Sequence, residues 1–184
     1  MRIAIMALQG AFEEHRQVLE RMGEEPFLVR NINDWRQEKQ ALIIPGGEST
    51  TMTRIMHDLG MWDEVRQEIL GGLPVLGTCA GLIMLDRLHL ATMDILAKRN
   101  AYGRQLGSFH TEGDFQGLGR VPMTFIRAPY IAEVGPEVEV LAQVDGHIVA
   151  ARQGCQLVTA FHPELDSDTR IHRLLLDMAN RRSN

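Results

Sequence analysis

The chain has 184 residues, of which 45% are hydrophobic and 23% charged, and a formal net charge of −5. This length and mixture are typical of a globular protein, so we expect residues 1–184 to form a single domain. The acidic balance argues against nucleic-acid binding, and two cysteines give no disulfide framework. The N-terminal apolar run is too short for export or membrane spanning, which favours a cytoplasmic protein without membrane partners.

The first half of the chain alternates short apolar runs with helical patterns. The runs that predict strands are 3–8, 26–30, 41–44 and 75–77, and the segments that predict helices are 13–22, 52–59, 62–70 and a segment from 82 onward. A continuous apolar run is typical of a strand covered on both faces. The alternation therefore predicts an α/β fold with three layers, a mostly parallel open sheet with helices on both faces.

The second half is richer in strand-like segments. These are 95–99, 122–127, 137–144, 147–152 and 156–161, followed by a closing helix at 168–180. Asp145-Gly146 separates two of them and is a strong signal for a two-residue hairpin. We therefore expect antiparallel strands in this half. The connections 86–94 and 111–120 carry no pattern that predicts a structure.

The strand at 75–77 leads directly into Cys79, with Gly77 and Gly81 two residues away on either side. Glycines at these positions allow a sharp turn from strand to helix and leave room for a substrate. The start of a helix favours a thiolate, and free N–H groups of the first turn, such as that of Ala80, can bind an oxyanion. The pattern predicts a cysteine nucleophile. A buried core cysteine is the alternative.

His162-Pro163-Glu164 follows the last predicted strand. Pro163 biases His162 toward an extended conformation, in which residues two apart project to the same side. The histidine can act as general acid and base, and the carboxylate can orient it. Sites in open α/β sheets form at the carboxyl ends of strands, where Cys79 is also expected. A structural turn with an exposed histidine is the alternative.

A third strand end carries the glycine loop, residues 46–49, with the sequence Gly-Gly-Glu-Ser. Paired glycines let backbone N–H groups approach a ligand closely, which makes Gly47 a candidate oxyanion donor. The alternative is a plain turn, because glycine pairs commonly mark turns.

These motifs together carry a resemblance. Segment 77–81 with 162–164 is similar to the class I, triad-type glutamine amidotransferases. More narrowly, segments 8–11, 45–51, 99–105, 125–129 and 160–164 resemble the family of glutaminase subunits of pyridoxal 5′-phosphate synthase, over residues 3 to about 178. The resemblance implies that Cys79 attacks the side-chain amide of L-glutamine, with His162 as acid and base and Glu164 as its orienting partner.

The resemblance also implies further site residues and a partner. The implied glutamine contacts are Gly47, Glu48, Ser49, Arg104, Ile126 and Arg127, and the implied oxyanion or partner-coupled residues are Gln9, Gly46, Gly47 and Ala80. The implied partner is a synthase subunit that forms large rings, uses the ammonia to build pyridoxal 5′-phosphate and completes the oxyanion hole on docking. Neither a metal nor a cofactor is implied.

Three other functions compete with this interpretation. One is the glutaminase of another amidotransferase, serving imidazole or nucleotide synthesis, against which the motifs at Arg104 and Ile126-Arg127 argue. The second is a non-catalytic chaperone or stress-sensing module, in which Cys79 oxidises but forms no glutamyl adduct. The third is a thiol hydrolase acting on esters, which the glycine loop makes less plausible than an enzyme for a free amino acid.

Overall fold

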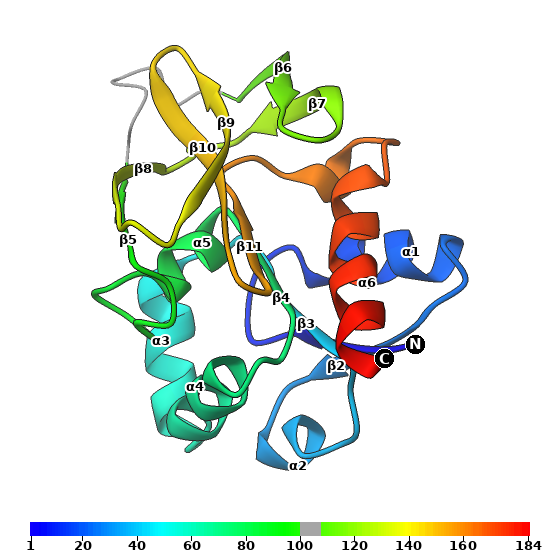
Figure 1. Cartoon of the computed structure of the whole chain (residues 1–184). Coiled ribbons are helices and arrows are strands. Elements are labelled where there is room, and N and C mark those ends of the chain that lie inside the picture. Colours follow the sequence, from blue (N-terminus) through cyan, green and yellow to red (C-terminus); the bar gives the residue numbers. More distant parts are fainter. Residues whose placement is uncertain (100–107) are drawn as a thin grey trace.

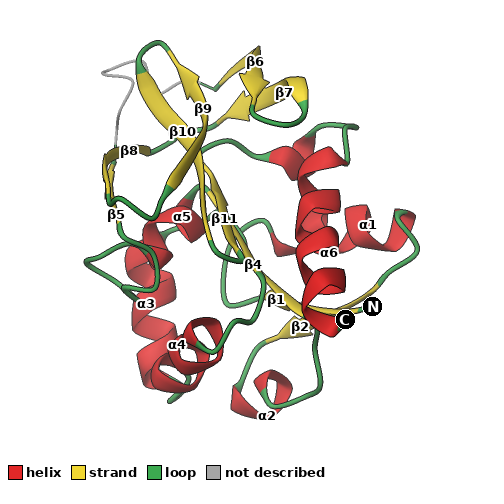
Figure 2. Ribbon diagram, in the orientation of Figure 1, coloured by secondary structure: helices red, strands yellow, loops and turns green. Residues whose placement is uncertain are grey.

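The computed structural model describes residues 1–99 and 108–184 (Figures 1 and 2). The strands are β1 (Arg2–Met6), β2 (Glu25–Val29), β3 (Ala41–Ile44), β4 (Val75–Thr78), β5 (Ile95–Lys98), β6 (Phe109–Phe115), β7 (Gly119–Phe125), β8 (Tyr130–Val134), β9 (Glu139–Val144), β10 (His147–Gln153) and β11 (Gln156–Thr159). The helices are α1 (Phe12–Arg21), α2 (Ile32–Trp35), α3 (Ser49–Asp58), α4 (Trp62–Leu70), α5 (Ala80–Leu85), α6 (Arg170–Ser183) and the 3-10 helix η1 (Pro163–Leu165). None of the helices in these two ranges is long and apolar enough to cross a membrane.

The N-terminal part of the sheet is parallel, with the strand order β2-β1-β3-β4-β11. Strands β3, β4 and β11 are buried at every residue, because their continuous apolar runs face a helix layer on both sides. Helices α1 and α6 cover one face, and α3, α4 and α5 lie on the other (Figure 1). The predicted three-layer α/β fold is confirmed.

Antiparallel strands extend the sheet beyond β11. Strand β10 pairs with β11, β9 and β8, and β8 pairs with β5 at the far edge. The predicted hairpin between β9 and β10 is present, with positive φ angles at both Asp145 and Gly146 (51° and 77°). Two consecutive positive φ angles match the right-handed twist of the paired strands.

Four elements of the described chain were absent from the sequence prediction: α2, β6, β8 and η1. Helix α2 is only four residues long and depends on the Asn31 side chain, which accepts a hydrogen bond from the backbone N–H of Asp34 at 2.9 Å. Strand β6 pairs only with β7 and alternates exposed residues with half-buried or buried ones. Its acidic residues and its glycine are of types depleted in strands, so its sequence gives little strand signal.

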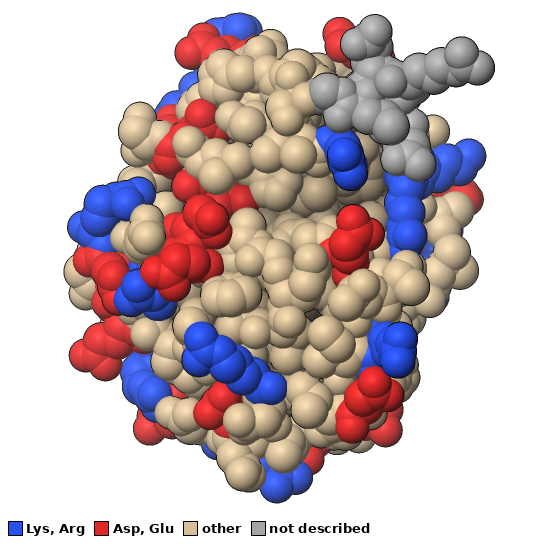
Figure 3. Space-filling view, turned by 180° about the vertical axis from the view of Figure 1, so that it is seen from behind, with Lys and Arg blue, Asp and Glu red and all other residues tan. Residues whose placement is uncertain are grey.

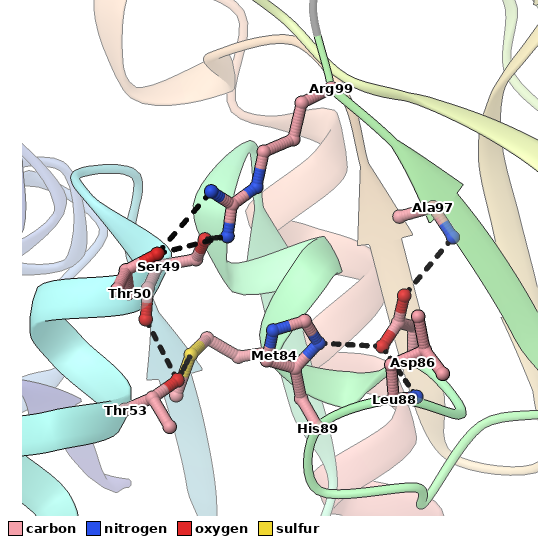
Figure 4. Close-up of polar contacts among 9 residues, drawn as sticks. All are labelled: Ser49, Thr50, Thr53, Met84, Asp86, Leu88, His89, Ala97 and Arg99. Atoms are coloured by element: carbon pink, nitrogen blue, oxygen red, sulfur yellow. Dashed lines mark hydrogen bonds and ion pairs between the residues drawn. The ribbon is translucent and has the colours of Figure 1, made fainter.

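The short connection at 86–94 is organised by Asp86, whose side chain is buried (Figure 4). The carboxylate accepts hydrogen bonds from the backbone N–H groups of Leu88 at 2.9 Å and Ala97 at 3.1 Å. One of its oxygens also lies 2.7 Å from Nδ1 of His89. Asp86 thus holds the end of α5 against β5, the strand that leads to Arg99.

Charges of both signs are interspersed over the face seen in Figure 3, mostly around its margin, while the centre is formed largely by uncharged residues. Among the described residues on this face there is no continuous basic surface. This distribution agrees with the formal net charge of −5.

Candidate active site

Cys79 lies in a sharp turn between β4 and α5, with φ 52° and ψ −106°. Residues other than glycine rarely adopt this conformation, which persists only where the surroundings enforce it. The flanking glycines allow the close packing: a Cβ at Gly77 would lie 2.6 Å from the carbonyl oxygen of Gly81, and one at Gly81 would overlap the carbonyl oxygen of Ile44. The Cys79 N–H donates to the carbonyl of Thr159 at 2.8 Å, which joins the turn to β11.

His162 and Glu164 follow β11 and are both buried, with 7% and 5% of their surfaces exposed. His162 Nδ1 lies 2.5 Å from Oε1 of Glu164. The predicted geometry of this pair was wrong, because Glu164 lies in the 3-10 helix η1 rather than in extended chain. The tight turn that begins at Pro163 folds the carboxylate back onto the imidazole ring. The backbone N–H of His162 donates to the carbonyl of Thr124 at 2.8 Å and fixes this turn to β7.

The environment of this pair favours its charged form. Burial lowers the pKa of His162, but hydrogen bonds to Cys79 and Glu164 and the charge of Glu164 outweigh it and raise this pKa to about 10. Burial raises the pKa of Glu164, but His15 and the hydrogen bond from His162 hold that pKa below its usual value. An imidazolium paired with a carboxylate therefore faces the sulfur of Cys79, which is the arrangement that activates cysteine nucleophiles.

The glycine loop connects β3 to α3 and packs against the cysteine and the histidine. A Cβ at Gly46 would lie 2.5 Å from Cε1 of His162 and 3.3 Å from Cβ of Cys79. Only a residue without a side chain therefore fits at this position without displacing the imidazole ring. The close approach brings the backbone of Gly47 to the edge of the site.

Gln9 supports the glycine loop from the other side. Its side-chain Oε1 accepts a hydrogen bond from the backbone N–H of Glu48 at 2.7 Å. The backbone N–H of Ala11 donates to the carbonyl of Gly46 at 2.9 Å. The connection between β1 and α1 therefore holds the loop through both a side chain and the backbone.

Residues 126 and 127 come from the antiparallel half of the fold. The carbonyl oxygen of Ile126 lies 3.9 Å from Sγ of Cys79, and the side chain of Ile126 is partly exposed. Arg127 has a positive φ of 46°, so the chain turns sharply directly after this contact. The turn carries both residues from the end of β7 to the nucleophile.

These residues surround one cleft of about 410 Å³. The predicted site residues that line it are Gln9, Gly46, Gly47, Glu48, Ser49, Cys79, Ala80, Ile126, Arg127 and His162. Glu164 lies behind His162 and does not line the cleft. Arg104, the remaining predicted residue, lies outside the described residues.

Arg99 also lines the cleft, although the sequence argument gave it no role. Its guanidinium group donates to Oγ of Ser49 and lies 3.3 Å from Oγ1 of Thr50 (Figure 4). The signal in the sequence was a basic residue at the last position of the predicted strand 95–99. That position alone does not distinguish a cleft residue from a solvated surface charge.

Metal binding finds no support in residues 1–99 and 108–184, where no group of three or more His, Cys, Asp or Glu side chains could hold a metal ion. Cys79 and Cys155 are both free thiols. The arrangement of nucleophile, imidazole and carboxylate at a cleft with backbone donors suits covalent acyl transfer.

Comparison with protein families shows the family to which this chain belongs. The model of the SNO glutamine amidotransferase family matches residues 5–181. The chain belongs to this family. The family resemblance predicted from the motifs is thereby confirmed.

Relatives of this SNO family protein are similar over nearly their whole length. The pyridoxal 5'-phosphate synthase subunit PdxT of Methanocorpusculum labreanum is 54% identical over 184 residues, 97% of each chain. The subunit of the same name from Streptococcus pneumoniae (strain CGSP14) is 52% identical over 188 residues, again 97% of each chain. A crystal structure of a glutamine amidotransferase is 41% identical, with a TM-score of 0.91, covering 97% of this chain and 98% of that one.

A more distant structure shares the fold alone. PurLQS from Thermotoga maritima matches 100% of this chain and 99% of that chain with a TM-score of 0.73, at 13% identity. The three-layer architecture therefore persists where little of the sequence is shared.

Proposed function

We propose that this chain is the glutaminase subunit of a pyridoxal 5′-phosphate synthase, which hydrolyses L-glutamine to L-glutamate and ammonia and delivers the ammonia to a synthase partner. The observation that carries the proposal is the meeting of Cys79 and His162 at one cleft with the glycine loop, with Glu164 hydrogen-bonded behind the histidine. The PdxT relatives, at 54% and 52% identity, support the pathway.

In the first half of the reaction, Sγ of Cys79 attacks the side-chain amide carbon of glutamine. The carbonyl π electrons move to oxygen and form a tetrahedral oxyanion. When this intermediate collapses, the C–N bond breaks and His162 gives its proton to the leaving nitrogen, which departs as ammonia. The glutamyl group remains on Cys79 as a thioester.

In the second half, water attacks the thioester carbon and His162 takes up a proton from it. Collapse of the second tetrahedral intermediate breaks the C–S bond and releases L-glutamate. Glu164 stays ionised throughout, holds the ring orientation and stabilises the imidazolium in each half. The lowered pKa of Glu164 and the raised pKa of His162 suit these two roles.

The oxyanion requires donors on the far side of the attacked carbon. We assign this task to the backbone N–H groups of Ala80 and Gly47. Ala80 follows the nucleophile and begins α5, where the first N–H groups have no partner within the helix. Gly47 lies at the mouth of the cleft in the loop that Gln9 holds.

The rest of the cleft is assigned to recognition of glutamine. We propose Glu48 and Ser49 of the glycine loop, Arg104, and the pair Ile126 and Arg127 as the contacts. An arginine suits the substrate carboxylate, because its planar guanidinium forms paired hydrogen bonds. The sharp turn after Ile126 brings Arg127 into the lining of the cleft, which supports this assignment.

We further propose that docking of the synthase partner sets the glycine loop through Gln9 and so completes the oxyanion site. The partner subunits are expected to form large rings that carry glutaminase subunits at their surface. This coupling prevents the loss of ammonia when no synthase is present. We also propose that the reaction takes place in the cytoplasm, where a thiol such as that of Cys79 stays reduced.

The test is glutamate release from L-glutamine by the chain alone and with its cognate synthase subunit, with Cys79→Ala as the control. We expect little release by the chain alone and strong stimulation by the partner, lost in Cys79→Ala without loss of binding. Full activity of the isolated chain would contradict the coupling. No release in the bound state would overturn the glutaminase and favour a non-catalytic module.

A further inference from the structure

Two buried histidines lie behind the carboxylate of Glu164, on the side away from the cleft. His15 from α1 and His172 from α6 are completely buried. Nδ1 of His15 lies 2.9 Å from Nε2 of His172, and Nε2 of His15 lies 3.4 Å from Oε2 of Glu164 and 3.2 Å from Oγ1 of Thr78. The mechanism derived above uses neither histidine.

The two oxygens of Glu164 therefore face different rings. Oε1 is hydrogen-bonded to Nδ1 of His162, whereas Oε2 is buried without a conventional hydrogen bond among the described residues. A buried carboxylate oxygen requires a neighbouring donor, because an uncompensated negative charge is costly away from water. His15 Nε2 is in position to supply one.

The contacts select one arrangement of protons. Burial lowers the pKa of His15 and lowers that of His172 to about 3, so both rings are neutral at neutral pH. Each neutral ring has one N–H. With its proton on Nε2, His15 directs an N–H between Glu164 and Thr78, and its Nδ1 accepts from Nε2 of His172. The opposite arrangement would place a ring lone pair against the carboxylate.

We propose that His15 and His172 are positioning residues of the triad: His172 fixes the tautomer of His15, and His15 holds Oε2 of Glu164 so that Oε1 stays on His162. The orienting chain then runs from α6 through α1 to η1 and ends at Cys79. It joins α1 and α6, which cover one face of the sheet (Figure 1), to the nucleophile at the carboxyl end of the central strand β4.

The charges that face this chain are few. Glu164 and His162 act on His15 from the loop after β11, and Glu14 acts on it from α1. Arg21, at the end of α1, and Glu164 act on His172. Thr78, at the end of β4, contributes only a hydroxyl group. Few other charges among the described residues can therefore disturb the contact between Glu164 and the two rings.

The test compares His15→Met, which removes the donor, with His15→Gln, whose amide N–H can take the place of Nε2–H. Leu19→Ala, also fully buried on α1, is the matched control for lost packing. Two quantities are measured. One is kcat and KM for glutamine in the complex with the cognate synthase subunit. The other is the pH dependence of Cys79 alkylation by iodoacetamide in the full chain, with Cys155→Ser in every variant.

We expect His15→Met to lower kcat about 10-fold or more with little change in KM, because the misplaced carboxylate no longer aligns His162. The alkylation midpoint should move to higher pH by about one unit, since a weaker imidazolium gives less support to the thiolate. His15→Gln should recover part of both effects. Leu19→Ala should lower the melting temperature and leave kcat and the midpoint unchanged.

The measurement of kcat and KM rests on the proposed function, but the measurement of Cys79 alkylation does not. A shifted midpoint without any glutamine hydrolysis would support the positioning role and contradict the glutaminase. Glutamine hydrolysis with the same kcat and midpoint in His15→Met and Leu19→Ala would overturn the positioning role. If His15→Met does not fold, His172→Met decides: a midpoint shift in the same direction supports the role, and an unchanged midpoint overturns it.

Discussion

The side-chain carbonyl of Gln9 accepts a hydrogen bond from the backbone N–H of Glu48 across 2.7 Å. The same oxygen occupies the space that a side chain at Gly47 would require. The conformation of the glycine loop is therefore coupled to a residue on the connection between β1 and α1. A displacement of Gln9 should therefore also displace the backbone of the glycine loop beside Cys79.

Replacing Gln9 with alanine should lower kcat/KM of the complex with the synthase subunit by up to about 10-fold, the value of one hydrogen bond. Gln40→Ala is the matched control, because Gln40 accepts a similar bond from the backbone N–H of Arg2 at 2.6 Å and does not line the cleft. Equal kinetics of the two variants would show that the Gln9 contact does not control the loop.

Gly46→Ala tests the contact between the glycine loop and the histidine. The added Cβ would lie 2.5 Å from Cε1 of His162, so the ring must move out of line with Cys79. We expect a loss of about 100-fold in kcat, measured as glutamate release by the complex, with the variant still folded.

Gly60→Ala is the control for the glycine substitution. Gly60 has a positive φ of 67° and nothing within 4 Å of an added Cβ. This variant should lose about 1 kcal/mol of stability and keep its activity. Glutaminase activity of Gly46→Ala close to that of the unmodified chain would show that the histidine tolerates displacement.

The sequence predicted well those features that depend on residues close together in the chain. The turn at Cys79 needs glycines at positions 77 and 81, because an added Cβ at either position would clash with the backbone. The hairpin between β9 and β10 likewise needs residues that accept a positive φ, and Asp145-Gly146 provides them. The parallel strands were predictable because burial on both faces requires continuous apolar runs, as in β3 and β4.

The features that the sequence did not predict depend on contacts between distant segments. His15 and His172 are 157 residues apart, and the residues around each of them do not predict their contact. Arg99 meets Ser49 across 50 residues for the same reason. The pairing of His162 with Glu164 was predicted, but the 3-10 turn that creates it was not.

Arg99→Met should raise KM for glutamine about 10-fold with a smaller effect on kcat. The reason is that Ser49 and Thr50, which receive the guanidinium group, lose their orientation at the start of α3. Hydrogen bonds to charged groups are worth about 1.5–3 kcal/mol, which covers this loss. The measurement is glutaminase kinetics of the complex.

Arg54→Met is the control for this arginine, because Arg54 is paired with Asp58 on the exposed side of α3 and does not line the cleft. It should leave KM unchanged. The assignment of Arg99 would be wrong if its variant changed KM no more than Arg54→Met does.

The pairing of His162 with Glu164 should also appear in stability. A raised pKa means that the imidazolium contributes stability fully below the unfolded value of 6.5 and loses it as pH rises through about 10. The lowered pKa of Glu164 has the opposite sign, so its contribution is present above the usual 4.5 and is lost as pH falls. The contributions of His162 and Glu164 to stability are therefore both fully present between pH 4.5 and pH 6.5.

Glu164→Gln should therefore destabilise the chain most near pH 6.5, by about 2 kcal/mol, the value of a hydrogen bond between charged groups. The difference should shrink as pH rises toward 10, because the imidazolium then loses its proton in the unmodified chain as well. Urea unfolding of both chains across this range measures the difference directly. A destabilisation that is the same at both ends would mean that His162 is not held as an imidazolium by Glu164, and the acid in the proposed reaction would then need another source.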